Sequence, residues 1–246
     1  MMAMLALYLD TAILVFCRVS AFIMVLPGFS SLRIPVRVRL GVAMAISFAL
    51  MPLFPQAMAP TPSAIGAEVL TGLVMGLSVR VLFGAFSFAA TAIATFIGLA
   101  GMPGAPLESE EGQTPLAALI TLTATALVFA TGLHGALIVA LADSYAVVPP
   151  GTWPAPSAVL EAHAAHLGDA FLMVLRLAMP FLIYAVIVNL AIGLANKMSP
   201  QIPVYFISMP FVVGGGLIVF ASLGPDMVSL FAAAADDAVR SGAGWR

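Results

Sequence analysis

The chain has 246 residues, of which 62% are hydrophobic and only 8% are charged, and its formal net charge is −2. A mean hydropathy of +1.13 excludes an ordinary soluble domain, because one domain cannot bury that much hydrocarbon and most of it must face lipid or other apolar chains. The small net charge argues against nucleic-acid binding. The single cysteine, Cys17, excludes an internal disulfide and a multi-cysteine metal site.

The N-terminal stretch is apolar, but it carries Asp10 and lacks a basic n-region and a small-residue cleavage site. We therefore expect the first segment to remain in the mature protein.

Six apolar segments are predicted to be helices, because they are longer than strands and do not alternate strictly. A helix needs about 20 residues to cross ~30 Å of hydrocarbon. The second segment is too short for a comfortable crossing, and the third is too long for a single one. In chain order the segments are Thr11–Leu26, Leu40–Phe54, Val69–Met102, Leu116–Ala142, Ala170–Ala195 and Val204–Leu223.

Prolines and glycines interrupt the last two segments. Pro180 and Pro210 each remove a backbone hydrogen bond and predict a kink, and Gly214, Gly215 and Gly216 weaken the last helix further. Broken helices at membrane depth require protein or a water-filled cavity to satisfy the freed backbone groups. We therefore predict an all-α integral membrane protein of bent and broken helical hairpins that packs into an assembly.

The connections between the segments differ in character. The acidic stretch Gly98–Thr114 contains too much glycine and proline for a helix. The stretch Asp143–Asp169 is predicted to be the longest connection, with several prolines.

Polar side chains inside the apolar segments are candidate functional or structural residues, because a charge there costs ~2.5 kcal/mol or more unless it is paired or hydrated. An ion pair within the fold is favoured over a direct role in conduction. The candidate partners are Asp10, Glu68, Asp143 and carbonyl groups of other chains. The residues concerned are Arg18, Arg80 and Arg176, with Asn189 as a milder case.

Glycines at multiples of four residues mark the third segment. Gly72, Gly76 and Gly84 follow this spacing, with Arg80 in the same series. Small residues at such positions let helices approach closely, and generic helix packing is the favoured interpretation.

Three histidines are candidates for a chemical role. His163 and His166 stand three residues apart with Asp169 a further three along, but successive steps of three drift by about 60° around a helix. The zincin pattern also requires a glutamate after the first histidine. We favour a polar helix start over a metal site. His134 is interpreted as a polar tip near the end of a helix.

The acidic stretch has two interpretations, a plain surface loop or a flexible plug in a protein-lined passage. The residues that would form such a plug or gate are Gly101, Met102, Pro103, Gly104, Glu108, Glu110, Glu111, Gly112 and Gln113.

Three motifs stand in order in the second half of the chain, at Asn189 to Gly193, at Lys197-Met-Ser-Pro-Gln201 and at Val204 to Pro210. They resemble the FliR family of flagellar type III export-gate proteins, and the resemblance runs in order from about Arg18 to about Leu223. At Lys197 family members more often have an arginine. The matching structural or motif residues are Arg18, Gly72, Gly76, Arg80, His134, Asp143, Arg176, Asn189, Gly193, Lys197, Pro200, Gln201 and Pro210.

This resemblance implies one export-gate domain over residues 1–246, with a FliP-like part over about 1–165 and a FliQ-like hairpin over about 166–246. It implies the partners FliP, FliQ, FlhB and FlhA, exported flagellar proteins as substrates, and a place in the flagellar basal body at the inner membrane. It also implies a loop that helps to close the pore, and Gly98–Thr114 matches the position of that loop.

The sequence thus predicts a non-enzymatic channel subunit without a cofactor, through which unfolded flagellar proteins are threaded. No Gly-x-x-x-x-Gly-Lys pattern is present, so a nucleotide-hydrolysing P-loop is excluded. The alternatives are a virulence injectisome gate subunit, which is a related family, a small-molecule or ion transporter, and an intramembrane metalloprotease.

Overall fold

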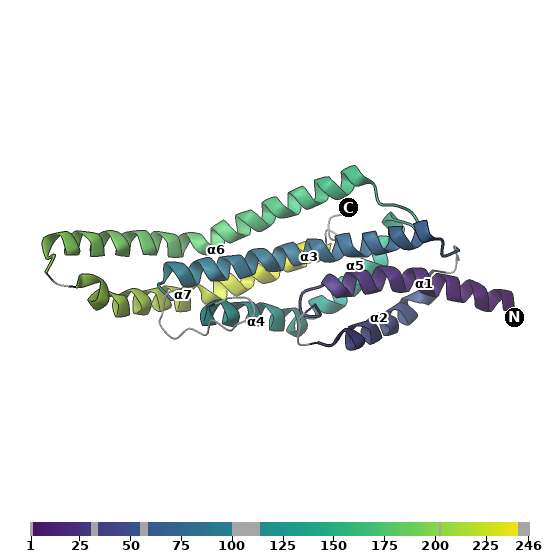
Figure 1. Cartoon of the computed structure of the whole chain (residues 1–246), viewed down its shortest axis with the longest axis horizontal. Coiled ribbons are helices and arrows are strands. Elements are labelled where there is room, and N and C mark those ends of the chain that lie inside the picture. The colour runs from purple at the N-terminus through teal and green to yellow at the C-terminus, as the bar shows by residue number, and fades with distance from the viewer. Residues whose placement is uncertain (1, 31–33, 55–58, 100–113, 202, 241–246) are drawn as a thin grey trace. The chain divides into compact units, whose positions relative to one another are not determined.

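The computed structural model describes residues 2–30, 34–54, 59–99, 114–201 and 203–240. Every regular element in these ranges is helical (Figure 1). The elements are α1 (Met2–Val25), α2 (Val36–Leu50), the short 3₁₀ helix η1 (Met51–Leu53), α3 (Pro62–Phe96), α4 (Pro115–Ala130), α5 (Leu133–Val147), α6 (Pro156–Met198) and α7 (Val204–Arg240).

The chain divides into two compact units. Unit 1 comprises Met1–Phe83, Val128–Gly168 and Ala234–Arg246, and unit 2 comprises Gly84–Leu127 and Asp169–Ala233. Four helices contribute residues to both units, namely α3, α4, α6 and α7.

Prolines begin three of the helices. α3, α4 and α6 start at Pro62, Pro115 and Pro156, at the position where the missing N–H costs nothing and the fixed φ suits a helix. A threonine caps each of the first two of these helices. Thr61 Oγ1 accepts a hydrogen bond from the N–H of Ala64 in α3 at 3.2 Å. Thr114 Oγ1 accepts one from the N–H of Ala117 in α4 at 3.3 Å. These local signals fix where α3 and α4 begin.

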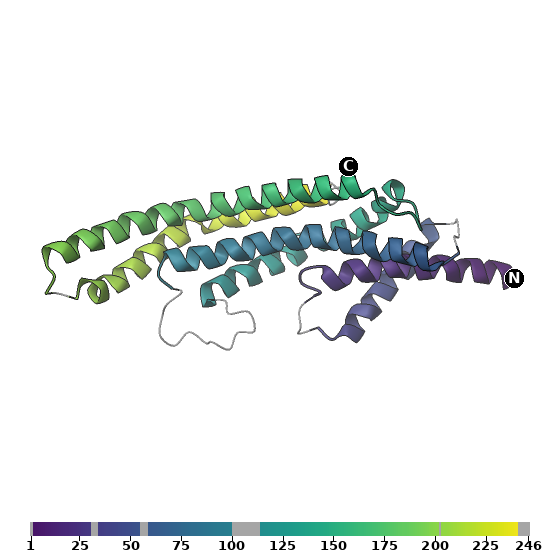
Figure 2. The same cartoon turned by 45° about the horizontal axis from the view of Figure 1, so that its top comes forward.

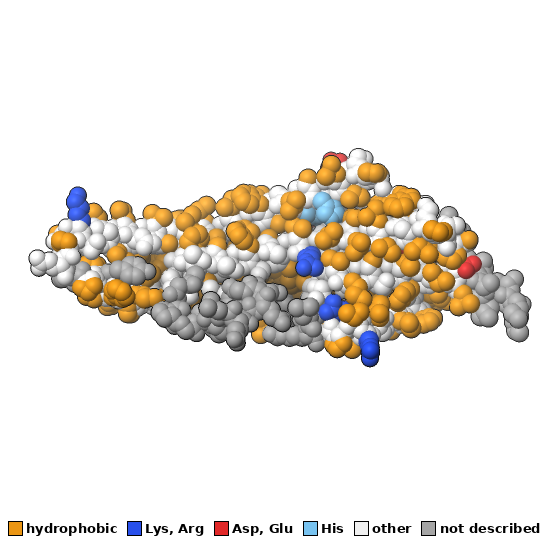
Figure 3. Space-filling model, in the orientation of Figure 1, with side chains coloured by type: hydrophobic (Ala, Val, Ile, Leu, Met, Phe, Trp, Pro, Cys, Tyr) orange, Lys and Arg blue, Asp and Glu red, His pale blue; other side chains and the backbone are white. Residues whose placement is uncertain are grey.

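Five of the described helices are long and apolar enough to cross a membrane, and a sixth crossing results if the bent pair α4–α5 is counted as one span. Hydrophobic side chains cover much of the face drawn in Figure 3, and charged groups on it are scattered. The prediction of an all-α membrane protein with about six apolar helical segments is confirmed.

The fourth predicted segment is not one helix, and that prediction is wrong. α4 ends at Ala130, α5 begins at Leu133, and the two are bent by 67°. Gly132 lies between them with a φ of +75°, a left-handed conformation that glycine adopts without a Cβ clash. His134 therefore stands at the start of a helix rather than near the end of one.

Several predicted boundaries are also wrong. α1 begins at Met2 rather than at Thr11, and α3 runs from Pro62 to Phe96 rather than from Val69 to Met102. Most of Asp143–Asp169 is helical, because α5 runs to Val147 and α6 begins at Pro156. α7 continues through Pro210 and the three glycines to Arg240, well past the predicted end at Leu223, because its last turns are rich in alanine, the strongest helix former.

Unit 1 has a packed core between α1, α2, α3 and α5. Val19 and Phe22 of α1, Ala43 of α2, Met75 of α3 and Leu141 of α5 belong to one cluster of buried residues. A void of about 30 Å³ lies beside it, with Phe22 and Leu141 of the cluster among its lining residues.

In unit 2, α6 and α7 form an antiparallel hairpin and run side by side from the turn that joins them (Figures 1 and 2). The hydroxyl of Tyr184 on α6 donates to the backbone carbonyl of Val212 on α7 at 2.7 Å. Gly216 of α7 faces Ile97, and a Cβ at this glycine would collide with the isoleucine side chain. The hydrogen bond of Tyr184 thus joins the two helices of the hairpin, whereas Gly216 brings α7 against Ile97, the residue that follows α3.

Candidate functional site

A buried ion pair lies at the centre of unit 1. Arg18 of α1 and Glu68 of α3 are both fully buried, and the Nε of Arg18 donates to Glu68 Oε2 at 2.7 Å while its Nη2 donates to Oε1 at 3.0 Å. This paired geometry uses the planar fork of the guanidinium. Of the partners considered from sequence, Glu68 is the one that Arg18 contacts.

Three further groups complete the surroundings of Arg18. Its Nη1 donates to Ser144 Oγ at 3.1 Å and its Nη2 to the carbonyl of Val148 at 3.0 Å. The ring of Tyr145 lies under the guanidinium, 3.8 Å from its centroid to Cζ, a distance at which a cation is attracted to an aromatic face. The arginine therefore joins α1 to the end of α5.

Glu68 also holds the turn that follows α5. Its Oε1 accepts from the N–H of Gly151 at 2.7 Å, and Gly151 has a φ of +73°, in the left-handed region that glycine tolerates. We name Arg18, Glu68, Ser144, Tyr145, Val148 and Gly151 the arginine cluster. Buried charges of this kind persist when every donor and acceptor is satisfied.

Glycines bring α3 against α1 beside the arginine cluster. A Cβ at Gly72 would collide with the backbone carbonyl of Arg18, and one at Gly76 would lie 3.0 Å from the carbonyl of Phe22. Gly84, the third glycine in the predicted series, has open space around its Cβ position. The four-residue spacing therefore marks a close helix approach at its first two members and not at its third.

The other arginines of the apolar segments have different surroundings. Arg80 and Arg176 are exposed, whereas Arg39 is buried and donates to the carbonyl of Ile34 at 3.0 Å. Asn189 satisfies its amide locally by donating to the carbonyl of Ala185 at 2.8 Å.

The remaining family-motif residues lie on α5 and on the α6–α7 hairpin. On α5, His134 is half-buried, with Nδ1 3.4 Å from the carbonyl of Val128, and Asp143 is exposed. The exposed motif residues around the α6–α7 turn are Asn189, Gly193, Lys197, Pro200, Gln201 and Pro210.

His163 and His166 do not assemble a metal site with the other residues that the structure describes. No group of three or more His, Cys, Asp or Glu side chains gathers in the described ranges. His163 lies 3.3 Å from Ser78 Oγ through its Nε2 and 2.9 Å from the carbonyl of Val159 through its Nδ1. These contacts link α6 to α3 within unit 1.

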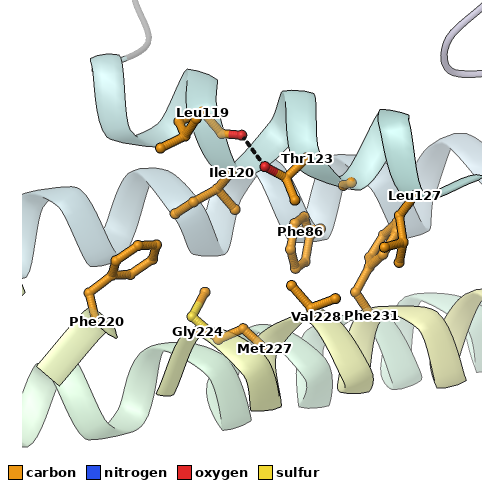
Figure 4. Close-up of a pocket in the computed structure, with 11 residues that line it drawn as sticks. Phe86, Leu119, Ile120, Thr123, Leu127, Phe220, Gly224, Met227, Val228 and Phe231 are labelled. Atoms are coloured by element: carbon orange, nitrogen blue, oxygen red, sulfur yellow. Dashed lines mark hydrogen bonds between the residues drawn. The ribbon is translucent and has the colours of Figure 1, made fainter. Parts of the chain in front are cut away.

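An apolar cavity of about 240 Å³ lies within unit 2, and Figure 4 shows side chains of α3, α4 and α7 around it. Thr123 is the polar side chain among its lining residues, and the Thr123 hydroxyl donates to the carbonyl of Leu119 at 2.9 Å. The lining residues are Phe86, Leu119, Ile120, Thr123, Ala124, Leu127, Phe220, Gly224, Met227, Val228 and Phe231.

The predicted plug lies outside the described residues. Gly101, Met102, Pro103, Gly104, Glu108, Glu110, Glu111, Gly112 and Gln113 all fall in the range 100–113. Their role stays a prediction.

Sequence reasoning missed most of the arginine cluster and the cavity. The sequence alone did not identify Ser144, Tyr145 or Gly151 as members of this cluster. The available signal was the requirement that a buried arginine satisfy all its donors, which points to polar groups on other helices without saying which.

Known proteins resemble the chain along nearly its whole length. Residues 9–238 match the family described as bacterial export proteins, family 1. The flagellar biosynthetic protein FliR of Caulobacter vibrioides is 31% identical over 218 residues, covering 85% of this chain and 86% of the relative. The protein of the same name from Escherichia coli is 30% identical, covering 85% and 82%, and that from Aquifex aeolicus is 28% identical, covering 86% and 84%.

Proposed function

The chain belongs to the bacterial export proteins, family 1, and from that premise we propose that it is a wall subunit of the flagellar type III export gate. The observation that carries the proposal is similarity over about 85% of the chain to relatives that are named flagellar biosynthetic proteins. It is a component of flagellar protein export, and in our proposal unfolded flagellar proteins pass beside it across the bacterial inner membrane.

The length of the apolar surface supports a gate built from several subunits. Exposed large hydrophobic residues follow α6 from Leu160 to Met198, a distance of about 57 Å at 1.5 Å per residue. Lipid tails cover only ~30 Å. Other protein chains are the natural cover for the remainder, because apolar surface of this extent is unstable in water.

In our proposal these chains are FliP and FliQ, with FlhB and FlhA adjoining. The α6–α7 hairpin supports the division into a FliP-like part over about 1–165 and a FliQ-like hairpin over about 166–246, since its two helices contact each other through Tyr184 and Val212. The subunit acts as a passive wall, and energy for transport comes from partner proteins.

The names of the relatives favour the flagellar apparatus over the virulence injectisome. They also favour a protein-export role over a small-molecule transporter or an intramembrane metalloprotease.

Deletion of the gene from its own bacterium, followed by complementation, tests the proposal. We expect loss of swimming and of secreted flagellar proteins, with both restored by the wild-type chain. Purification of a tagged chain is expected to recover FliP and FliQ. A deletion strain that still secretes flagellar proteins normally would reject the proposal.

The plug proposal has a separate test. Removal of residues 104–111 is expected to leave FliP and FliQ bound while the membrane becomes leaky to ions, because the loop would no longer close the pore. Unchanged ion conductance in a fully assembled gate would count against the plug.

A further inference from the structure

Arg176 is a lone charge on the long helix α6. Between Ala170 and Ala195 it is the only charged residue, and its side chain is exposed. A guanidinium presents five N–H donors and stays positively charged in proteins. Whatever covers this part of α6 must therefore satisfy a fixed positive charge.

The surroundings of Arg176 on α6 are apolar. Leu172, Met179 and Ile183 follow helical spacing with Arg176 and share one side of the helix with it. These three side chains are 51%, 43% and 54% exposed. We name Leu172, Arg176, Met179 and Ile183 the Arg176 face. Another side of α6 is buried, at Met173, Val174, Leu177 and Phe181.

The described residues of unit 2 offer Arg176 no carboxylate. α6 itself has leucine, methionine and proline at the positions three and four residues away. In the neighbouring helix α7, the ring of Phe220 lies 6.5 Å from that of Phe181, and α7 has no acidic residue from Val204 to Gly224. Arg176 accordingly forms no ion pair with the part of the chain that the structure describes.

The charge of Arg176 restricts what can cover its face. A guanidinium against hydrocarbon is costly unless it is paired, and neither lipid tails nor apolar side chains supply a hydrogen-bond acceptor. A carboxylate accepts two parallel hydrogen bonds from the guanidinium fork and cancels its charge. The Arg176 face is therefore complementary to an apolar surface that carries one acidic side chain.

We propose that the Arg176 face docks a helix of another export-gate subunit, and that an aspartate or glutamate of that helix pairs with Arg176. The docked helix is apolar or small where it meets Leu172, Met179 and Ile183. This inference rests on the proposed function, because it takes the partner from the same assembly.

A zero-length crosslink tests the pairing. Lys197 is the only lysine of the chain, so Arg176→Lys in a Lys197→Arg background leaves a single lysine at the proposed contact. A membrane-permeant carbodiimide joins that amine to a carboxylate in direct contact as an amide, and the carbodiimide takes up the released water. In membranes from cells that make the full chain with the other gate subunits, we expect mass spectrometry to find an amide bond to an aspartate or glutamate of one of those subunits.

Phe171→Lys in the same background is the matched control. Phe171 is 62% exposed, and it lies about 140° around α6 from Arg176, since successive residues are about 100° apart. Its crosslink to the same acidic residue is expected to be about tenfold weaker, because an ion pair requires the two groups to lie within about 4 Å.

Removal of the charge tests whether the pair holds the subunits together. Arg176→Met is expected to lower the recovery of the crosslinked subunit with a tagged chain about tenfold, because the partner carboxylate then lies buried without its pair. Arg176→Lys is expected to keep most of the recovery. Arg176→Glu together with an arginine in place of the identified partner acid is expected to restore it.

Any of three results would overturn the proposal. The first is an assembled gate in which Arg176→Lys forms no crosslink to another subunit, which would mean that water or lipid headgroups cover Arg176. The second is an equal crosslink from Phe171→Lys, and the third is wild-type recovery of every subunit with Arg176→Met. Secretion by the deletion strain decides the proposed function separately, so that each idea can fail alone.

Discussion

In unit 1 the helices α1, α3 and α5 are joined by buried charges, whereas in unit 2 the helices α3, α4 and α7 surround an apolar cavity. The Arg18–Glu68 pair has contacts with four other groups of unit 1. The void beside the core of unit 1 is about 30 Å³, against about 240 Å³ for the cavity of unit 2.

The comparison shows two ways to join helices that are apolar around their circumference. Lipid tails are as apolar as the side chains of such a helix, so burying these side chains against another helix gains little free energy. Close packing and polar contacts therefore decide which helices pair with each other. Unit 1 uses a charged pair with a defined geometry. Unit 2 uses close packing at glycine and the hydroxyl of Tyr184 on α6, which donates to the carbonyl of Val212 on α7, and it leaves an apolar cavity between α3, α4 and α7.

The largest expected effect comes from breaking the Arg18–Glu68 pair. Arg18→Met or Glu68→Met alone is expected to destabilise unit 1 by about 3–5 kcal/mol, because each leaves an unpaired buried charge. Unfolding in detergent can be followed by the fluorescence of Trp153, which donates to Ser63 in unit 1, in a Trp245→Phe background.

The double variant Arg18→Met/Glu68→Met sharpens this prediction. It should cost clearly less than the sum of the two single changes, because neither charge is then buried without its partner. Arg80→Met, at an exposed arginine, is the control and should change little. Strictly additive losses would show that the pair is not coupled.

A second prediction compares two glycines on α3. Gly72→Ala is expected to destabilise the contact of α3 with α1 by about 1–3 kcal/mol, because its methyl group collides with the carbonyl of Arg18. Gly84→Ala meets open space and should stabilise the helix by up to about 1 kcal/mol. Hydrogen exchange of α1 and α3 measures both, and equal effects would contradict the close approach at Gly72.

A third prediction contrasts the cores of the two units through one kind of substitution. Ala43→Leu inserts bulk into the packed core of unit 1 and is expected to cost about 1–3 kcal/mol. Ala124→Leu projects into the cavity of unit 2 and is expected to stabilise it by about 0.5–2 kcal/mol. Destabilisation by both changes, seen in the thermal unfolding midpoint in detergent, would mean that the cavity does not accept a side chain.

The smallest expected effect concerns two tyrosine hydroxyls. Tyr184→Phe removes the hydrogen bond to Val212 and should weaken the α6–α7 hairpin by about 0.5–1.5 kcal/mol. Tyr145→Phe should be neutral or slightly stabilising, since its buried hydroxyl has no hydrogen-bond partner in the described part of the chain. Hydrogen exchange resolved by peptide separates the two units, and an equal loss in both variants would contradict the assignment.

Apolar runs in the sequence predicted the helices well but not all their limits. The third segment was predicted to begin at Val69, whereas α3 begins at Pro62, directly after the capping residue Thr61. Such a cap acts within one turn and adds nothing to an apolar run. The break at Gly132 was missed, because an isolated glycine is compatible with a continuous helix and only its conformation shows the bend.

The amino-acid sequence by itself determined the class of the protein, its helices and its family, because composition and motifs are properties of short stretches. It could not tell that Arg18 is buried while Arg80 and Arg176 are exposed. Arg18 meets Glu68 50 residues away and Ser144 126 residues away. Only the packing of separate helices brings such groups together. The cavity of unit 2 likewise exists only where α3, α4 and α7 meet, and no single segment encodes it.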